Sequence, residues 1–319
     1  MKIRLGYVSI ALNLPKITAS STVTYTNYEK QSSDEKKLNK LKQVTLSNLE
    51  NLYTILQYNI EKEIHFYRIT SQLIPLATHP KVDNWNYRKI FSRDFQKIGE
   101  FIKKHNMRVD THPDQFNVIN SIRDEVVEET KRNLWFHVKL FEDLDYYEGK
   151  MVLHIGSSHG GKEEAIKRFI NNFNSYPKEI RCRLILENDD KTFTAKEVLN
   201  ICKEIEVPMV LDVHHHRCKN NGEPIGELLK DIFSTWNKEK FPPKIHFSSP
   251  REGGFDRKHS DYINPYDFIE FVELSKSFEM DFDIMLEAKQ KDLALLKLIE
   301  DIKNIKSNWN WIDKTTIEI

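Results

Sequence analysis

Side chains that can bind metal ions lie at the ends of six separate apolar runs of the sequence. They are His112, His154, Glu187, Asp212, His215, His246 and Glu287. A carboxylate at the end of a fully apolar strand is costly to bury unless a cation or hydrogen-bond donors meet it. One such residue could be a core group with an ion-pair partner. A series on separate runs, mixed with histidines, predicts one polynuclear metal centre. His259 follows in a polar loop.

The ligand types narrow the choice of metal and of chemistry. Imidazole with carboxylate suits Zn²⁺, Mn²⁺, Fe²⁺ or Co²⁺, whereas Mg²⁺ and Ca²⁺ prefer shells of oxygen alone. No cysteine lies among these positions, which argues against a structural zinc site. Carboxylates such as Glu187 and Asp212 can bridge two metals, and such a pair can activate water and stabilise the leaving oxygen of a phosphoryl displacement. His214 and His216 flank His215, so the choice of imidazole there stays open.

Eight short runs rich in Val, Ile, Leu and Phe predict the strands that position these side chains. We expect strands near 4–10, 66–71, 108–112, 151–156, 183–188, 208–214, 244–248 and 282–287. Nearly continuous apolar character is typical of parallel strands that are buried on both faces. Between them, apolar residues recur at helical spacing, which predicts helices near 35–62, 94–105, 123–147, 161–175, 194–204, 225–236, 265–277 and 291–305.

Alternation of eight strands with eight helices is typical of a (β/α)8 TIM barrel. A doubly wound open sheet is the alternative, but its polar residues would gather near one switch point. Here they end most of the strands, so we predict a single TIM-barrel domain over residues 1–319, with its metal site at the C-terminal ends of the strands. Ser92 and Thr194 are expected helix N-caps. The polar segment 17–35 is expected to overhang the barrel mouth, as either a surface loop or a substrate-binding loop.

Composition excludes several classes of protein. No apolar stretch approaches the roughly 20 residues that span a bilayer, and the N-terminus lacks the apolar core of a signal peptide. Three widely spaced cysteines suit a reducing compartment, so we expect a cytoplasmic protein. Lys plus Arg equals Asp plus Glu at 48 each, which differs from a strongly basic nucleic-acid binder. Bound metals would neutralise several carboxylates, so DNA binding is not excluded.

Several segments of the sequence resemble the UV damage endonuclease (UVDE) family, whose members are ATP-independent repair nucleases related in fold to apurinic endonuclease IV. The resemblance covers most of the chain, and its most specific segments are YRITSQLIPLATHP, HPDQF and KIHFSS. It implies one metal held by His112, His154 and Glu187; a second held by Glu187, Asp212, His246 and Glu287; and a third held by His215 and His259. The implied catalytic residues are Glu187, Lys244, His246 and Glu287.

The resemblance also implies residues that probe DNA. Gln115 and Phe116 match the positions that probe the strand opposite the lesion, and an apolar wedge of this kind can kink a duplex. Tyr7 matches a tyrosine that lines the lesion pocket, and Asn13 matches a nearby asparagine. Their alternatives are a packing role for Tyr7 and an ordinary loop amide for Gln115.

The resemblance implies an endonuclease that cuts double-stranded DNA immediately 5′ to pyrimidine dimers and 6-4 photoproducts, and the strand-end ligands agree with a metal-dependent nuclease. We expect two to three divalent ions, first Mn²⁺ and otherwise Zn²⁺, Co²⁺ or Mg²⁺, with no nucleotide cofactor, no membrane partner and a monomeric state. Two other functions use some of the same features. A xylose-isomerase-like sugar isomerase shares the strand-end ligands, and a metal-dependent DNA-damage binding protein would leave the backbone intact.

The resemblance further implies that Lys244 carries a carboxylate on its amine. Lys244 precedes His246 by two residues, so both face the barrel interior on a regular strand, with Lys244 one layer deeper. We expect it beside metal-bound carboxylates. Burial near cations lowers the pKa of a lysine and exposes the neutral amine that reacts with carbon dioxide. The alternative is an unmodified lysine paired with a carboxylate. Arg257 stands where endonuclease IV has an acid at its third metal.

Overall fold

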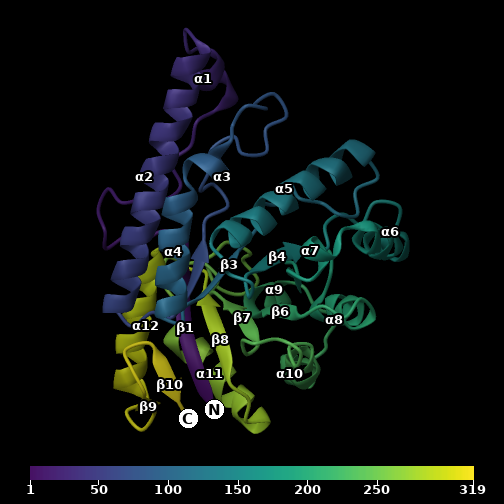
Figure 1. Cartoon of the computed structure of the whole chain (residues 1–319). Coiled ribbons are helices and arrows are strands. Elements are labelled where there is room, and N and C mark those ends of the chain that lie inside the picture. Colours follow the sequence, from purple (N-terminus) through teal and green to yellow (C-terminus); the bar gives the residue numbers. More distant parts are fainter.

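A computed structural model describes residues 1–319 as a closed parallel barrel with helices on its outside (Figure 1). Eight strands pair in chain order, and β1 pairs with both β2 and β8, which closes the sheet. The strands are β1 (Lys2–Val8), β2 (Phe66–Ile69), β3 (Arg108–Thr111), β4 (Lys150–His154), β5 (Leu184–Glu187), β6 (Met209–Asp212), β7 (Lys244–Phe247) and β8 (Phe282–Leu286). The predicted TIM barrel is confirmed.

A helix forms in each of the eight predicted helical segments. These are α2 (Asp34–Glu61), α4 (Ser92–Lys104), α5 (Asp124–Asp143), α6 (Lys162–Ser175), α8 (Ala195–Glu204), α10 (Ile225–Ser234), α11 (Pro265–Ser275) and α12 (Lys291–Ile305). Short helices lie between them: α1 (Tyr25–Glu29), α3 (Tyr87–Ile90), α7 (Lys178–Arg181), α9 (Val213–Cys218) and the 3-10 turn η1 (Lys276–Phe278). No helix is long and apolar enough to cross a membrane.

One predicted helix cap is confirmed and the other is wrong. Thr194 caps α8 in a capping box, in which its hydroxyl accepts from the N–H of Glu197 and the Glu197 carboxylate accepts from the N–H of Thr194. Ser92 is instead the first residue of α4, behind Phe91, which offers no capping side chain. The reason is that α3 leads directly into α4, so the Phe91 N–H already donates to the Tyr87 carbonyl.

Segment 17–35 is more ordered than the loop expected from its polar sequence. It contains α1, and the Thr24 hydroxyl accepts from the N–H of Asn27 at the start of that helix. Asn48, buried on α2, donates to the carbonyls of Ser21 and Leu73 and accepts from the Ser21 N–H, at 2.8–3.0 Å. Tertiary hydrogen bonds to a distant helix therefore fix a segment that its own composition leaves undecided.

The two chain ends meet beside β1, in an arrangement that the strand pattern did not predict. A hairpin of β9 (Asn310–Trp311) and β10 (Thr316–Glu318) adds antiparallel to β1, in register Lys2 with Glu318 and Ile3 with Ile317. The ammonium group of Met1 donates to the carbonyl of Ile319 at 3.0 Å. Both ends therefore lie together, at the end of the barrel where β1 begins (Figure 1).

Near that same end, the barrel interior holds a closed set of charges. Asp283 of β8 is fully buried, and its two oxygens accept from Nε and Nη2 of Arg4, both at 2.6 Å. Arg108 of β3 donates to the same carboxylate at 2.6 Å and to the carbonyl of Pro242 at 2.8 Å. These buried ions are paired with one another, as folded proteins require.

Candidate metal centre

The predicted ligands come together at the C-terminal ends of the strands because the parallel register aligns them. His154 of β4 lies opposite Glu187 of β5, and Asp212 of β6 lies opposite His246 of β7. Glu287 directly follows Leu286, the last residue of β8. Barrel active sites are built at this end of the strands. The predicted ligand side chains therefore gather at the end of the barrel where they were expected.

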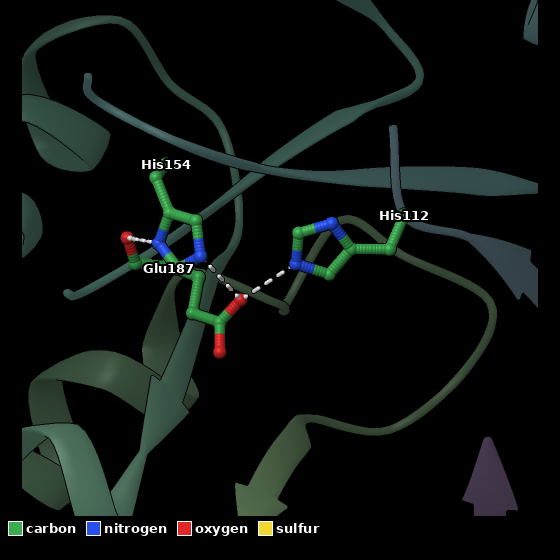
Figure 2. Close-up of side chains that lie close together, drawn as sticks. All are labelled: His112, His154 and Glu187. Atoms are coloured by element: carbon green, nitrogen blue, oxygen red, sulfur yellow. Dashed lines mark hydrogen bonds and ion pairs between the residues drawn. The ribbon is translucent and has the colours of Figure 1, made fainter. Parts of the chain in front are cut away.

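Glu187 is the residue at which the other ligands converge. Its carboxylate is buried, with Oε2 at 3.2 Å from Nε2 of His112 and 3.5 Å from Nε2 of His154. Figure 2 shows this oxygen between the two imidazole rings. On the other side, Nδ1 of His246 lies 2.7 Å from Oε1. Burial alone would raise the pKa of Glu187, but the nearby imidazoles His246 and His154 outweigh it and hold that pKa well below its ordinary value. A charged, shared carboxylate is suited to bridge metals.

Four histidines are held by their Nδ1 atoms in a way that leaves Nε2 free. His112 donates from Nδ1 to the carbonyl of Pro113 at 2.9 Å, and His154 donates to the carbonyl of Glu187 at 3.3 Å. The other two donate to Asn188 and Glu287, in the bonds His215 to Asn188 at 2.9 Å and His259 to Glu287 at 2.6 Å. A neutral ring that donates from Nδ1 carries a lone pair on Nε2, which is how protein metal sites fix the tautomer of their imidazole ligands.

Asp212 supplies a buried oxygen with no partner in the protein. Its Oδ1 accepts from the N–H of His215 at 2.7 Å and so caps α9, whereas its buried Oδ2 makes no hydrogen bond. Burial raises the pKa of Asp212 to about 7. Burial would lower the pKa of His215, but Asp212 and Glu187 outweigh it and raise that pKa to about 9. An orphaned carboxylate oxygen beside an imidazole fits a divalent cation.

Three groups of side chains bring their ligand atoms close enough to hold an ion, and Glu187 belongs to all three. The groups are His112, His154 and Glu187; Glu187, Asp212 and His215; and Glu187, His246 and Glu287. The first matches the expected set. Asp212 groups with His215, whereas it was expected with His246 and Glu287. His259 lies outside the three groups, with its ring centre 6.3 Å from that of His215.

The geometry of α9 shows which of the three consecutive histidines, His214, His215 or His216, faces the other candidate ligands. His215 alone faces Glu187, because residues 214 and 216 leave the helix in other directions. His216 bonds to the carbonyl of Glu223 on the outer side, and burial lowers its pKa. His214 is buried near Cys218, and burial lowers its pKa to about 4. The sequence left this choice open because it does not show where the helix begins.

Lys244 lies inside the barrel, as expected, but its neighbour is not the expected one. It is fully buried, and its ammonium group donates to Asp110 of β3, which belongs to none of the three metal groups. Burial lowers the pKa of Lys244 to about 8. The expectation of a metal-bound carboxylate beside Lys244 is therefore wrong, because Asp110 of β3 reaches Lys244 across the barrel interior and fills that place.

Arg68 of β2 is a buried residue of the centre that the sequence analysis missed. Its Nη1 lies 2.7 Å from Oε1 of Glu287, and its Nη2 lies 2.7 Å from Nε2 of His246. Burial would raise the pKa of Glu287, but Arg68 outweighs it and lowers that pKa. The signal was present in the strands FYRI and RVDT, in which Arg68 and Asp110 are charged residues at positions that are buried. Only the barrel register shows that they meet.

The loop between β3 and α5 presents the expected probing residues beside the metal ligands. Phe116 is 75% exposed, and its N–H donates to the carboxylate of Asp114 at 2.9 Å, which fixes the turn. Gln115 borders two cavities. One, of about 360 Å³, contains His112, His154, His215 and His259. The other, of about 770 Å³, lies between this loop, α5 and residues 71–80, and Phe116 also borders it.

The two residues expected at the lesion pocket differ in exposure. Tyr7 is fully buried, its hydroxyl donates to Oδ1 of Asn59 at 2.8 Å, and its ring packs edge-on against Tyr67. The side chain of this β1 residue therefore packs in the core, which agrees with the alternative of a packing role for Tyr7. Asn13 is exposed on the loop that follows β1.

Comparison with known proteins agrees with this geometry. The family model described as UV-endonuclease UvdE matches residues 3–318. A protein of Bacillus cereus (strain B4264) named UV DNA damage endonuclease is 40% identical over 308 residues, which cover 96% of each chain. The crystal structure of SacUVDE superposes with a TM-score of 0.84 at 38% identity, over 95% of this chain and 99% of that one.

A more distant structure shares the fold. Endonuclease IV from Thermus thermophilus has a TM-score of 0.56 at 13% identity, over 95% of this chain and 99% of that chain. At this identity the likeness concerns the barrel alone. The family match across nearly the whole sequence, together with relatives about 40% identical over the same span, shows that this chain belongs to the UV-endonuclease UvdE family.

Proposed function

We propose that this protein is a metal-dependent endonuclease that cuts double-stranded DNA immediately 5′ to UV photoproducts, leaving 3′-hydroxyl and 5′-phosphate ends without ATP. Membership of the endonuclease family supports the reaction class. It argues against both the sugar isomerase and the DNA-damage binding protein that leaves the backbone intact.

One observation carries the proposed metal dependence. Nε2 of His112 and Oε2 of Glu187 face each other at 3.2 Å, although His112 already donates from Nδ1 to Pro113. Two lone pairs at that distance repel unless a proton or a metal cation lies between them, and a divalent metal can replace the proton. Oδ2 of Asp212, on the neighbouring strand β6, is also buried without a hydrogen-bond partner, and a cation would satisfy it. Mixed nitrogen and oxygen donors without a thiolate favour Mn²⁺ over a structural zinc.

The three groups assign residues to two or three divalent ions. Glu187 with His112 and His154 would hold one ion, Glu187 with His246 and Glu287 would hold a second, and Asp212 and His215 with the nearby His259 would hold a third. Bound divalent ions supply a hydroxide near neutral pH and charge that stabilises the leaving 3′ oxygen. Arg68 contacts Glu287 and His246 and would hold both ligands in position.

Recognition of the lesion is assigned to the exposed loop that carries Gln115 and Phe116. A photoproduct is already poorly stacked, so its extrusion costs less than that of normal bases. An exposed aromatic side chain can then enter the opened stack. Replacing both residues with Ala should weaken binding to irradiated DNA roughly tenfold, because stacking contributes ~1–3 kcal/mol per base. Metal content should not change, and an unchanged ratio of damaged to undamaged binding would contradict this role.

The carbamate on Lys244 stays a prediction from the family resemblance. A lysine with a pKa of about 8 offers neutral amine at physiological pH, which supports it. The carbamate would be an anion beside Asp110, so the two groups would need a shared proton or cation. Intact mass measured under non-acidic conditions tests it: the modified protein gains the mass of one carbon dioxide, whereas an active enzyme of unmodified mass would contradict it.

A nicking assay tests the proposed function as a whole. Irradiated and unirradiated supercoiled plasmid are each incubated with the protein, with and without added Mn²⁺, beside a binding assay on the same DNA. Nicking of irradiated plasmid alone, abolished by chelation and independent of ATP, supports the proposal. Binding to irradiated plasmid without any nicking would support a damage-binding protein instead.

A further inference from the structure

A hairpin that we call the finger runs from Pro250 to His259, in the connection between β7 and α11. Pro250 and His259 form an antiparallel bridge, and the N–H of Arg251 donates to the carbonyl of Lys258 at 2.8 Å. The residues between the two ends are exposed at nearly every position. Only the last residue, His259, takes part in the function proposed above, so the exposed part of the finger has no role yet.

The finger lies across the barrel mouth from the loop that carries Gln115 and Phe116. That loop follows β3 and the finger follows β7, and strands four apart stand opposite each other in a closed barrel of eight. Gln115 and two residues of the finger, Arg257 and His259, border the same cavity of about 360 Å³, together with the other candidate ligand histidines. A DNA strand that spans the mouth from Gln115 across the candidate metal centre therefore reaches the finger.

Arg251 and Lys258 place two like charges directly opposite each other. Their backbones pair across the hairpin, so both side chains leave it on the same face. Both residues are exposed, and of the cations in the finger only Arg257 forms an ion pair, with Asp190 at 3.5 Å. Like charges opposite each other destabilise a strand pair, and an anion bound between them removes that repulsion. The charge arrangement of the finger therefore favours an anionic partner on this face.

The tip of the finger presents an apolar side chain that the protein leaves uncovered. Phe255 is 77% exposed, slightly more than Phe116 at 75% on the opposite side of the mouth. Two contacts hold the turn: the carboxylate of Asp256 accepts from the N–H of Lys258 at 3.1 Å, and the thiol of Cys218 on α9 donates to the carbonyl of Phe255 at 3.7 Å. An exposed aromatic ring beside cations is the combination with which proteins bind nucleic-acid strands.

We propose that the finger is a second DNA-binding element, which binds the sugar-phosphate backbone on the side of the metal centre away from Phe116. Arg251 and Lys258 each bind a phosphate, and Phe255 packs against the adjacent sugars. The inference rests on the proposed function for the identity of the partner. Phosphates are the same in damaged and undamaged DNA, so these contacts contribute affinity without preference for a lesion. Lesion preference stays with Gln115 and Phe116.

The salt dependence of DNA binding tests the inference. Each phosphate contact releases counterions, so the logarithm of the affinity falls with the logarithm of the salt concentration, with a slope of about −0.9 per contact. On an undamaged duplex, measured by fluorescence anisotropy, the double variant Arg251→Gln with Lys258→Gln should reduce the magnitude of that slope by about two. On the same duplex with one thymine dimer, KM should rise by the factor by which undamaged binding weakens, with kcat and bound Mn²⁺ unchanged.

Two lysines at the other end of the same strand provide a matched control. Lys238 and Lys240 precede β7, lie on the surface and pair with Glu206 and Glu148. Changing both lysines to Gln removes the same number of charges and should leave the salt slope unchanged. Phe255→Ala should weaken binding to both duplexes roughly fivefold without changing the slope, because an apolar contact releases no counterions.

The outcomes distinguish the inference from the proposed function. A salt slope that stays at the wild-type value in Arg251→Gln with Lys258→Gln would overturn the inference, whether or not the protein nicks irradiated plasmid. A loss of affinity confined to the dimer-containing duplex would also overturn it, because the finger would then recognise the lesion. A reduced slope in a protein that never nicks irradiated plasmid would contradict the proposed function and leave the finger as a DNA-binding element.

Discussion

Buried charges lie at both ends of the same barrel. Only those at one end find all of their ion-pair and hydrogen-bond partners within the protein. At the end where the strands begin, Asp283 is fully paired with Arg4 and Arg108. At the end where they finish, Asp212 keeps an oxygen without a partner, and the lone pair of His112 faces the carboxylate of Glu187. Closed ion pairs in a barrel interior stabilise the fold. Buried acids without a partner, beside imidazoles held by their Nδ1 atoms, form groups that could hold a cation.

The largest effect that this comparison predicts is the loss of nicking in Glu187→Gln. The amide keeps the shape of Glu187 but removes the charge that three metal groups share. Nicking should fall by more than the roughly 10–100-fold that loss of an outer partner costs. Bound Mn²⁺ should fall as well, with an unchanged circular dichroism spectrum. Native nicking rates in this variant would show that the metal centre lies elsewhere.

Asp283→Asn should instead affect the fold. Removing this charge leaves Arg108 buried and unpaired among Phe66, Trp236 and Phe241, at a cost of about 3–5 kcal/mol in the free energy of unfolding. Urea denaturation measures it, with Asp301→Asn as the control because its Lys297 partner lies on the surface. While folded, Asp283→Asn should bind Mn²⁺ normally. If Asp283→Asn instead lost Mn²⁺ without losing stability, the charges at the two ends of the barrel would not have separate roles in folding and in metal binding.

A smaller effect should appear in the pH dependence of Mn²⁺ binding. Metal ligands must be deprotonated, and the pKa values of Asp212 and His215 are about 7 and about 9. At pH 7 a metal therefore displaces protons, so its affinity should rise about tenfold from pH 7 to pH 8. Calorimetry in buffers of different ionisation enthalpy counts those protons. His215→Gln should flatten the dependence of Mn²⁺ affinity on pH. A wild-type affinity that does not change with pH would contradict a metal site at Asp212 and His215.

The strand positions and most of the site could be predicted from the sequence because they depend on local patterns. Doubly buried strands are continuously apolar, so a lone Glu187 or Asp212 at the end of one is conspicuous. The sequence analysis missed Arg68 and Asp110 because neither residue is conspicuous alone. Arg68 pairs with Glu287 and Asp110 pairs with Lys244, and both contacts depend on the barrel register.

Other features were mispredicted because they depend on contacts between distant parts of the chain. Tyr7 was expected at the lesion pocket from the family resemblance, but its depth in the core is set by Asn59 on α2 and by the ring of Tyr67. The order of segment 17–35 depends on Asn48, and the strands β9 and β10 depend on the free edge of β1. Ser92 has the right chemistry for a cap, but α3 precedes it.

The junction of the chain ends has a mechanical consequence. A load applied across Met1 and Ile319 pulls apart neighbouring ends of two antiparallel strands, β1 and β10. Hydrogen bonds in such a pair run perpendicular to the strands, so the force meets them one at a time and opens the pair like a zipper. The hairpin at the chain ends is therefore the weakest point under tension. Glu187 and Glu287, at the far end of the barrel, bear no load while it opens.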